Sequence, residues 1–194
     1  YCGYGVNFYF WIFGDDPKPY NSYGNGASMR VSAAGTVASS LEEALALSKR
    51  VTAISHNHPE GIKGAQAIAA CIFLARQGKS KKQIRNYIEE NFEGYNLHRT
   101  LDEIRPDYNF WEICQKSVPE SIISYIEANS YTAAIRNAIS LGGDADTMAC
   151  MAGGIAIATK GMEMPENLAY YIYNHVLDDY LRQVLYEFNQ LSPL

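Results

Sequence analysis

Apolar residues along this chain recur every three or four positions over several long segments, which is the spacing of one face of an α-helix. This pattern predicts helices over residues 41–55, 59–77, 81–91, 119–128 and 131–141. It also predicts one longest helix from Pro165 to about Asn189, with an i, i+4 apolar stripe from Leu168 to Phe188. No segment alternates apolar and polar residues over six positions, so the pattern favours an all-α protein with no strands.

Local residues mark several helix ends. Ser40 and Ser80 precede predicted helices, where a side-chain oxygen can accept a hydrogen bond from a free backbone N–H group. Gly78 is a natural helix stop, since glycine tolerates the left-handed backbone found there. Residues 95–108 are predicted to form a loop with a short turn, because Pro106 interrupts any regular helix.

The length and composition are those of an ordinary globular protein. The chain has 194 residues, of which 47% are hydrophobic and 19% charged, so it suits one domain with a sizeable core. This composition excludes a disordered chain, a collagen-like repeat and a disulfide-rich miniprotein. The net charge of −5 comes without any basic stripe, which argues against nucleic acid as a partner.

The apolar segments and cysteines indicate a cytoplasmic protein. The run from Met148 to Thr159 is rich in Ala and Gly and shorter than the ~20 residues of a membrane helix, so we expect a core helix and no membrane partner. No signal-peptide pattern is visible at the start of the chain. The four cysteines are far apart and form no C-x-x-C pair, so we expect them to be reduced and mostly buried rather than zinc ligands: Cys2, Cys71, Cys114 and Cys150.

The strongest candidate for chemistry is the sequence Leu-Gly-Gly-Asp-Ala-Asp-Thr at residues 141–147, directly before a predicted helix. Asp144, Asp146 and Thr147 place two carboxylates and a hydroxyl within four positions, and such oxygen ligands suit a hard cation such as Mg²⁺. Gly142 and Gly143 allow a tight turn and close approach to a ligand. The alternative is an ordinary acidic cap on an alanine-rich helix.

A second candidate is the glycine- and asparagine-rich stretch at residues 21–30, Asn-Ser-Tyr-Gly-Asn-Gly-Ala-Ser-Met-Arg. Such a loop can present backbone N–H groups to a phosphate, and Arg30 could add a positive charge. The alternative is a plain loop made of turn-forming residues.

A third candidate is Ser55-His56-Asn57-His58, directly before Pro59. A His-x-His pair can indicate a transition-metal site, but no further ligands stand nearby. The alternatives are a segment that caps the following helix, or a role for His56 in stacking on or hydrogen bonding to a ligand.

Taken together, in this order and spacing, the three stretches resemble the ADP-ribosylglycohydrolase family, and the resemblance extends from about Tyr4 to Gly161. It implies a single orthogonal multi-helix bundle and two Mg²⁺ or Mn²⁺ ions in a cleft where ADP-ribose is removed from a modified acceptor. By this resemblance the metal ligands are Asp144, Asp146 and Thr147. The residues that line the diphosphate, the ribose and the nucleotide are Ser22, Tyr23, Gly24, Asn25, Gly26, Met29, Arg30, His56, Gly142 and Gly143.

This chain departs from the family pattern in one respect. Members carry an N-terminal portion with Gly-Asp-x-x-Gly and Thr-Asp-Asp-Thr motifs, which supplies the other metal ligands and an acidic catalytic residue, and neither motif occurs here. The pair Asp15-Asp16 stands before Pro17 in the wrong context, so no metal role is assigned to it and the catalytic residue is unknown.

We therefore expect a chain that lacks the N-terminal helices and holds half of the metal site. It would be a fragment of a longer enzyme, one of two complementary chains, or a degenerate member. Its partners would be ADP-ribose or an ADP-ribosylated substrate, together with the missing portion or a second copy that covers exposed core surface. The alternative function is a non-catalytic ADP-ribose-binding or crystallin-like structural protein on the same fold.

Overall fold

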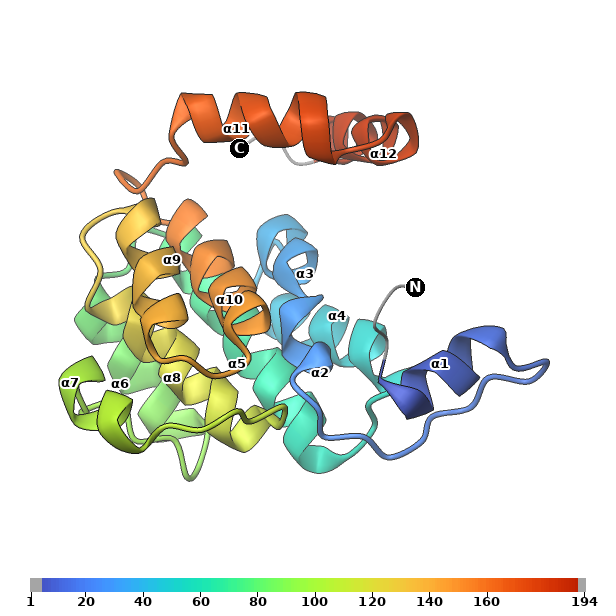
Figure 1. Ribbon diagram of the computed structural model, residues 1–194, viewed down its shortest axis with the longest axis horizontal. Coiled ribbons are helices and arrows are strands. Elements are labelled where there is room, and N and C mark those ends of the chain that lie inside the picture. The colour runs from blue at the N-terminus through green and yellow to red at the C-terminus, as the bar shows by residue number, and fades with distance from the viewer. Residues whose placement is uncertain (1–4, 192–194) are drawn as a thin grey trace.

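The computed structural model describes residues 5–191, and all regular secondary structure in that range is helical, as the sequence pattern predicts (Figure 1). The helices are α1 (Val6–Phe13), α2 (Gly26–Met29), α3 (Ser32–Val37), α4 (Leu41–Ala53), α5 (Pro59–Arg76), α6 (Lys81–Asn91), α7 (Leu101–Ile104) with the 3₁₀ turn η1 (Arg105–Asp107), α8 (Cys114–Ile126), α9 (Tyr131–Ser140), α10 (Ala145–Ile157), α11 (Glu166–Tyr171), the π-helical segment η2 (Ile172–Val176) and α12 (Asp179–Leu191).

Helix α5 forms the centre of the molecule and packs against α2, α3, α4, α6, α8 and α10. Ile68 and Ile72 are fully buried, and burial of each such side chain contributes about 1.5–3 kcal/mol. Small residues let the neighbouring helices come close. A Cβ atom on Gly64 would lie 2.7 Å from Ser28 Oγ and 2.8 Å from Cys114 Cβ, so α2 and α8 both pack directly on the α5 backbone.

Helix ends with local signals lie where the sequence predicts them. Ser40 Oγ accepts a hydrogen bond from the backbone N–H of Glu43 at 3.1 Å and begins α4. Ser80 and Gln83 form a reciprocal capping box at the start of α6, whose bounds match the prediction. Gly78 follows α5 with a φ of +72°, the left-handed conformation expected of a glycine stop.

The prediction that Pro119 begins a helix is wrong. Helix α8 starts five residues earlier, at Cys114, and Pro119 lies inside it and is buried. The start of α8 is tied to the loop before α2, because Asn25 N donates to Glu112 O at 2.8 Å and Cys114 N donates to Tyr23 O at 3.0 Å. These tertiary contacts, and burial of most of α8, outweigh the backbone hydrogen bond that proline cannot make.

The prediction of one long C-terminal helix is also wrong. After α11 the backbone widens into a π-helical segment, Leu177 takes an extended conformation, and α12 begins anew at Asp179. The Asp178 carboxylate accepts a hydrogen bond from Leu181 N at 2.8 Å and so acts as a helix cap. The apolar stripe is real, but an aspartate within it restarts the helix.

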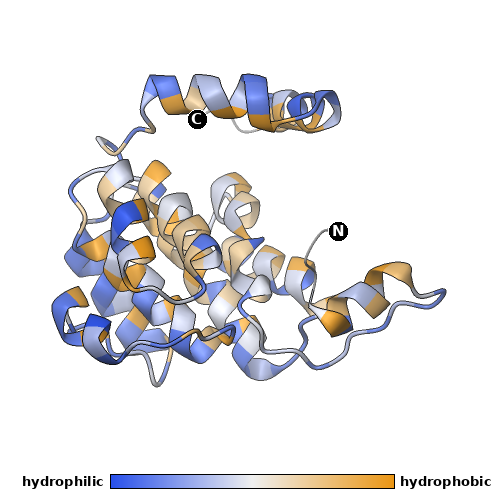
Figure 2. Cartoon of the chain, in the orientation of Figure 1, coloured by the Kyte–Doolittle hydropathy of each residue, from blue (hydrophilic) through white to orange (hydrophobic). Residues whose placement is uncertain are grey.

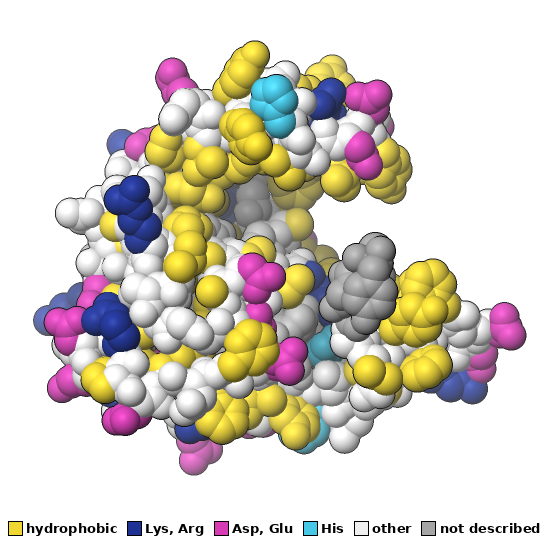
Figure 3. Space-filling model, in the orientation of Figure 1, with side chains coloured by type: hydrophobic (Ala, Val, Ile, Leu, Met, Phe, Trp, Pro, Cys, Tyr) yellow, Lys and Arg dark blue, Asp and Glu magenta, His cyan; other side chains and the backbone are white. Residues whose placement is uncertain are grey.

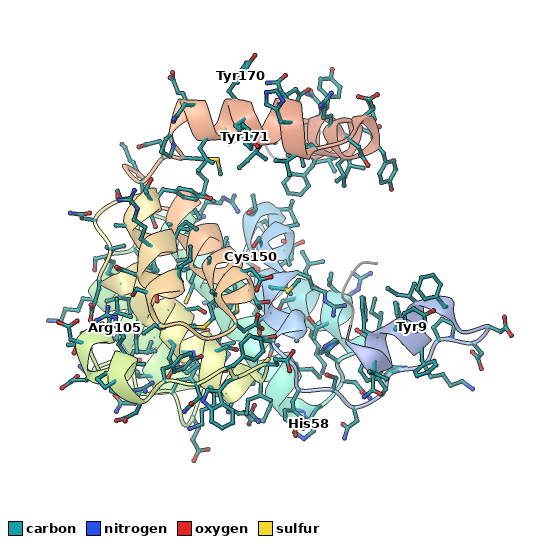
Figure 4. The ribbon with its side chains drawn as sticks, viewed as in Figure 1. Tyr9, His58, Arg105, Cys150, Tyr170 and Tyr171 are labelled. Carbon is teal, nitrogen blue, oxygen red and sulfur yellow. The ribbon has the colours of Figure 1, made fainter. Side chains whose placement is uncertain are left out.

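Helices α11 and α12 form an arm across a hollow from the main body (Figures 1 and 3). The face of the arm toward the body is hydrophobic (Figure 2), and Figure 4 marks Tyr170 and Tyr171 on α11. The arm carries an apolar groove of about 470 Å³. It is lined by residues such as Met164, Tyr173 and Leu185, none of which belongs to a candidate motif. The large apolar side chains exposed on the arm include Leu168, Val176, Tyr180, Leu181, Val184, Tyr186 and Leu191.

Two further sequence predictions concern the membrane and the cysteines. Over residues 5–191 no helix combines the length and the apolar character needed to cross a bilayer. Cys71 and Cys114 are buried free thiols, whereas Cys150 is a free thiol exposed on α10, so burial holds for two of these three. Cys2 lies outside the described residues.

Candidate functional site

The side chains of Asn25 and Asp144, 119 residues apart in sequence, meet in the structure. Asn25 Nδ2 donates a hydrogen bond to Asp144 Oδ2 at 2.7 Å, and Asn25 is only 5% exposed. Asp144 stands at the cap position of α10, yet its side chain caps no backbone N–H group. The ordinary helix-cap interpretation therefore does not describe Asp144, whose carboxylate is held by the glycine loop instead.

Asp144 and Asp146 form a coupled pair of carboxyl groups. Burial raises the pKa of Asp144, and the neighbouring Asp146 raises it further. Two hydrogen bonds lower the pKa of Asp146. The larger effect comes from the bond with Asp144, and the smaller from the bond that Thr147 N donates at 2.9 Å. Two adjacent carboxyl groups of this kind resist full ionisation unless a cation compensates their charge.

These residues fit a hard cation. Two carboxylates and the Thr147 hydroxyl provide the oxygen ligands that Mg²⁺ and Mn²⁺ prefer, with waters able to complete the shell. Thr147 Oγ1 lies 3.6 Å from Met29 Sδ, which connects the start of α10 to the end of α2. Within residues 5–191 no group of three or more His, Cys, Asp or Glu side chains is placed to hold a metal, so this cluster offers part of a ligand set.

The glycine loop is bonded to the segment before α8 and also within itself. Gly24 pairs with Ile113 in an isolated antiparallel bridge, and Gly24 N donates to Ser22 Oγ at 3.1 Å. Ideal Cβ positions on Gly24 and Gly26 each lie 3.5 Å from His56 Nε2, so both glycines lie directly beside that ring.

Arg30 links the glycine loop to the His56 segment. Its Nε donates to Gly26 O at 2.7 Å, its Nη1 to Ser55 Oγ at 3.1 Å and its Nη2 to His56 Nδ1 at 3.1 Å. His56 is 6% exposed, and burial together with the Arg30 charge lowers its pKa to about 4. The imidazole is therefore neutral at physiological pH.

The His-x-His pair is not a metal-binding pair here. His58 caps α5, since its Nδ1 accepts a hydrogen bond from Glu60 N at 3.1 Å. The His58 ring lies 5.0 Å from the ring of Tyr23, which is 43% exposed. The two histidines thus have different roles: one caps a helix and the other lies buried beside the glycine loop.

Glycine is needed at position 142 because of the backbone conformation there, and at position 143 because Tyr108 leaves no room for a side chain. Gly142 has a φ of +72°, a conformation that favours glycine. A Cβ atom on Gly143 would overlap the Tyr108 ring and lie 3.2 Å from Asn109 O. The Tyr108 hydroxyl lies 3.0 Å from the carbonyl oxygen of Lys116, so this ring cannot easily move away.

Replacing Gly143 by alanine is expected to displace the turn that carries Asp144. Because Tyr108 is held in place, the added methyl group must shift the turn and lengthen the Asn25–Asp144 hydrogen bond. We expect this variant to lose about 1–3 kcal/mol in the free energy of unfolding, measured by urea denaturation, because overpacking against a fixed neighbour is destabilising. Gly5→Ala, at an exposed glycine with a φ of −57° and no heavy atom within 4 Å of its Cβ position, is the matched control. Equal free energies of unfolding for both variants would contradict the close contact between Gly143 and Tyr108.

The structure adds residues that sequence reasoning missed. Tyr108 packs on Gly143, Ser55 bridges Arg30 and His56, and the ring of Phe8 on α1 lies 5.3 Å from Arg30 Cζ. The aromatic-rich beginning of the chain was the only available signal for Phe8. Helix α1 itself extends away from the body (Figure 4, where Tyr9 is labelled), and Phe8 is the residue of α1 that contacts Arg30 and His56.

All three sequence motifs therefore meet in one region of the fold. The links are Asn25 with Asp144, Met29 with Thr147, and Arg30 with His56. By contrast, Asp16 pairs with Lys18 at 2.6 Å on an exposed loop.

This arrangement is accompanied by a clear family match. The family model for ADP-ribosylglycohydrolase covers residues 5–191, and the chain belongs to this hydrolase family. Human ADP-ribosylhydrolase ARH3 is 27% identical in an alignment of 217 positions, which includes 88% of this chain and 60% of the human protein. Bovine ADP-ribosylhydrolase ARH3 is 28% identical in an alignment that includes 88% of this chain and 59% of the bovine protein. The chain thus spans less than two thirds of these relatives.

A solved structure described as an ADP-ribosylglycohydrolase-related protein complex shares the all-α fold. It superposes with a TM-score of 0.66 at 19% sequence identity, over 95% of this chain and 64% of that one.

Proposed function

We propose that this chain binds ADP-ribose and forms part of a metal-dependent hydrolase that removes ADP-ribose from a modified acceptor. The observation that carries the proposal is the hydrogen bond from Asn25 to Asp144, which joins the glycine loop to the acidic start of α10. The contact supports the proposal, because a glycine-rich loop can present N–H groups to a phosphate and a pair of carboxylates can hold a divalent cation. Family membership supports the same substrate class.

Each part of the site has a role in the proposal. Asp144, Asp146 and Thr147 would hold Mg²⁺ or Mn²⁺, which when bound supplies positive charge to orient ribose hydroxyls. The loop Ser22–Gly26, with Met29 and Arg30, would line the diphosphate and ribose, and Gly142 with Gly143 would allow the ribose to approach closely. Carboxylate charge nearby would favour a positively charged sugar in the transition state.

Hydrolysis by this chain alone is expected to be weak or absent. The cluster provides two carboxylates, and within residues 5–191 no larger group of His, Cys, Asp or Glu side chains is placed to hold a metal. Turnover would need further ligands from another segment or chain, or from a second copy, and the exposed apolar face of the arm would suit such a contact. The cytoplasmic location stays a prediction from the cysteines.

Thermal unfolding with and without ADP-ribose, in Mg²⁺ and again in EDTA, tests the proposal. Ligand at 100 times its Kd should stabilise the fold by about 2.7 kcal/mol, which raises the Tm by several degrees. We expect this rise in Mg²⁺ and a smaller one in EDTA, and no comparable rise with adenosine. A cooperative transition that ADP-ribose leaves unchanged in both buffers would contradict the proposal and favour a structural, crystallin-like role.

A further inference from the structure

We infer that Arg30 is a positioning residue that holds His56 in a single neutral form, with its ring hydrogen on Nε2 and directed toward Gly24 and Gly26. The ligand side of this inference rests on the proposed function. The state of the free imidazole does not, and it can be measured without any ligand.

The hydrogen-bond pattern determines which ring nitrogen carries the hydrogen. A guanidinium group has only donors, so the Arg30 Nη2 contact of 3.1 Å requires His56 Nδ1 to be the acceptor. Ser55 Oγ lies 3.1 Å from Arg30 Nη1 and 2.9 Å from the same Nδ1 atom. Ser55 therefore accepts from Arg30 and donates to His56. With Nδ1 accepting, the hydrogen of the neutral ring must be on Nε2.

Arg30 is itself fixed in place. Its Nε donates to Gly26 O at 2.7 Å, and its guanidinium carbon lies 5.3 Å from the centre of the Phe8 ring. A planar group held by three directed hydrogen bonds and an aromatic face has little freedom to turn. The same side chain thus anchors the glycine loop and orients the histidine next to it.

The Nε2–H group faces the backbone of the glycine loop. Ideal Cβ positions on Gly24 and Gly26 each lie 3.5 Å from Nε2, at ordinary van der Waals contact, so these two residues border the space beside this donor. A ligand acceptor with negative charge, such as a diphosphate oxygen, is the group that this N–H donor would bind. The donor is neutral, so its burial does not carry the large cost of a buried ion.

The charge of Arg30 also favours the neutral form of the His56 ring. Within residues 5–191 the side chains that face His56 are the Arg30 guanidinium, the Ser55 hydroxyl, the Phe8 ring and the Tyr20 phenol, whose ring lies 5.5 Å away edge-on. Arg30 is the only charged group among them, and it repels an imidazolium. The low pKa of His56, which follows from burial and from Arg30, agrees with the geometry.

Nitrogen-15 NMR of the imidazole rings in the ligand-free chain, from pH 7.5 to 5, tests the assignment. We expect wild-type His56 to show the Nε2–H form throughout. In Arg30→Met, which removes both the charge and the donors, we expect mixed tautomers and a pKa at least one unit higher. Arg50→Met, at an exposed arginine on α4, is the control and should match the wild type. A wild-type ring with its hydrogen on Nδ1, or an unchanged ring in Arg30→Met, would overturn the inference.

Two further variants keep the test decisive if Arg30→Met does not fold. Arg30→Lys retains a donor and a charge, so it should preserve most of the Nε2–H form. Ser55→Ala removes one of the two donors to Nδ1 but leaves Arg30, so the Nε2–H form should persist. Loss of this form in Ser55→Ala would show that Ser55, and not Arg30, controls the ring.

ADP-ribose affinity in Mg²⁺, measured relative to Arg50→Met at each pH, tests the ligand side. Arg30→Met should bind about tenfold more weakly at pH 7.5 and recover part of that loss at pH 5, because about half or more of its histidine is then a cation with two donors. A merely structural defect would give a loss that does not depend on pH, and this result would overturn a role in positioning. If the wild type binds no ADP-ribose, the proposed function fails while the NMR result still decides the role of Arg30.

Discussion

Replacing Asp144 by asparagine is expected to abolish the Mg²⁺-dependent part of ADP-ribose binding. The amide removes the negative charge that a divalent cation requires but keeps an oxygen that can still accept from Asn25. Thermal stability without ligand should therefore change little. It should even rise slightly, since burial and Asp146 oppose the ionised form of Asp144.

The expected loss in ADP-ribose affinity is about 100-fold, which corresponds to about 2.7 kcal/mol. Calorimetric titration in Mg²⁺ and in EDTA separates the metal-dependent part, which should vanish in Asp144→Asn. Asp144→Ala should lose the same part and also destabilise the fold by about 1–3 kcal/mol, because the buried Asn25 amide then lacks its acceptor. Asp16→Ala, at an exposed loop aspartate, is the control. Full Mg²⁺-dependent affinity in Asp144→Asn would disprove the metal assignment.

Replacing Gly64 by alanine is expected to destabilise the fold, because the added methyl group has no room between three packed helices. The new Cβ atom would lie 2.7 Å from Ser28 Oγ, 2.8 Å from Cys114 Cβ and 2.9 Å from Cys114 Sγ. Because both neighbours are fully buried on packed helices, α2 and α8 must move away from α5. Overpacking of this kind costs about 1–3 kcal/mol, and the helix propensity of alanine offsets about 1 kcal/mol of it, so we expect a net loss of up to about 2 kcal/mol.

Urea unfolding followed by circular dichroism measures this effect. Gly154→Ala on α10 is the matched control, since its Cβ atom would approach only Ser32 Oγ closely, at 2.7 Å, and the next atoms lie 3.6 Å away. The half-buried Ser32 side chain can rotate, so this variant should be as stable as the wild type or more so. Equal free energies of unfolding for the two variants would show that close packing at Gly64 is unimportant.

Helices were predictable where their ends are encoded by neighbouring residues. The Ser80–Gln83 capping box and the Gly78 stop act within four positions, so the bounds of α6 and the end of α5 follow from local chemistry. Pro119 misled the prediction because a distant loop supports the start of α8. Asp178 misled it because one polar residue in an amphipathic stripe fits either a helix interior or a helix cap.

The order and spacing of the three motifs, and with them the family, could be read from the sequence alone. Residue type determines this much, since carboxylates, glycines and a histidine each have limited chemistry. Only the tertiary structure decided that Asn25 binds the Asp144 carboxylate, that Arg30 and Ser55 both contact Nδ1 of His56, and that Tyr108 packs on Gly143. These contacts join residues that are far apart along the chain, or they choose one of several hydrogen-bond partners. Both depend on packing around α5, which no local pattern specifies.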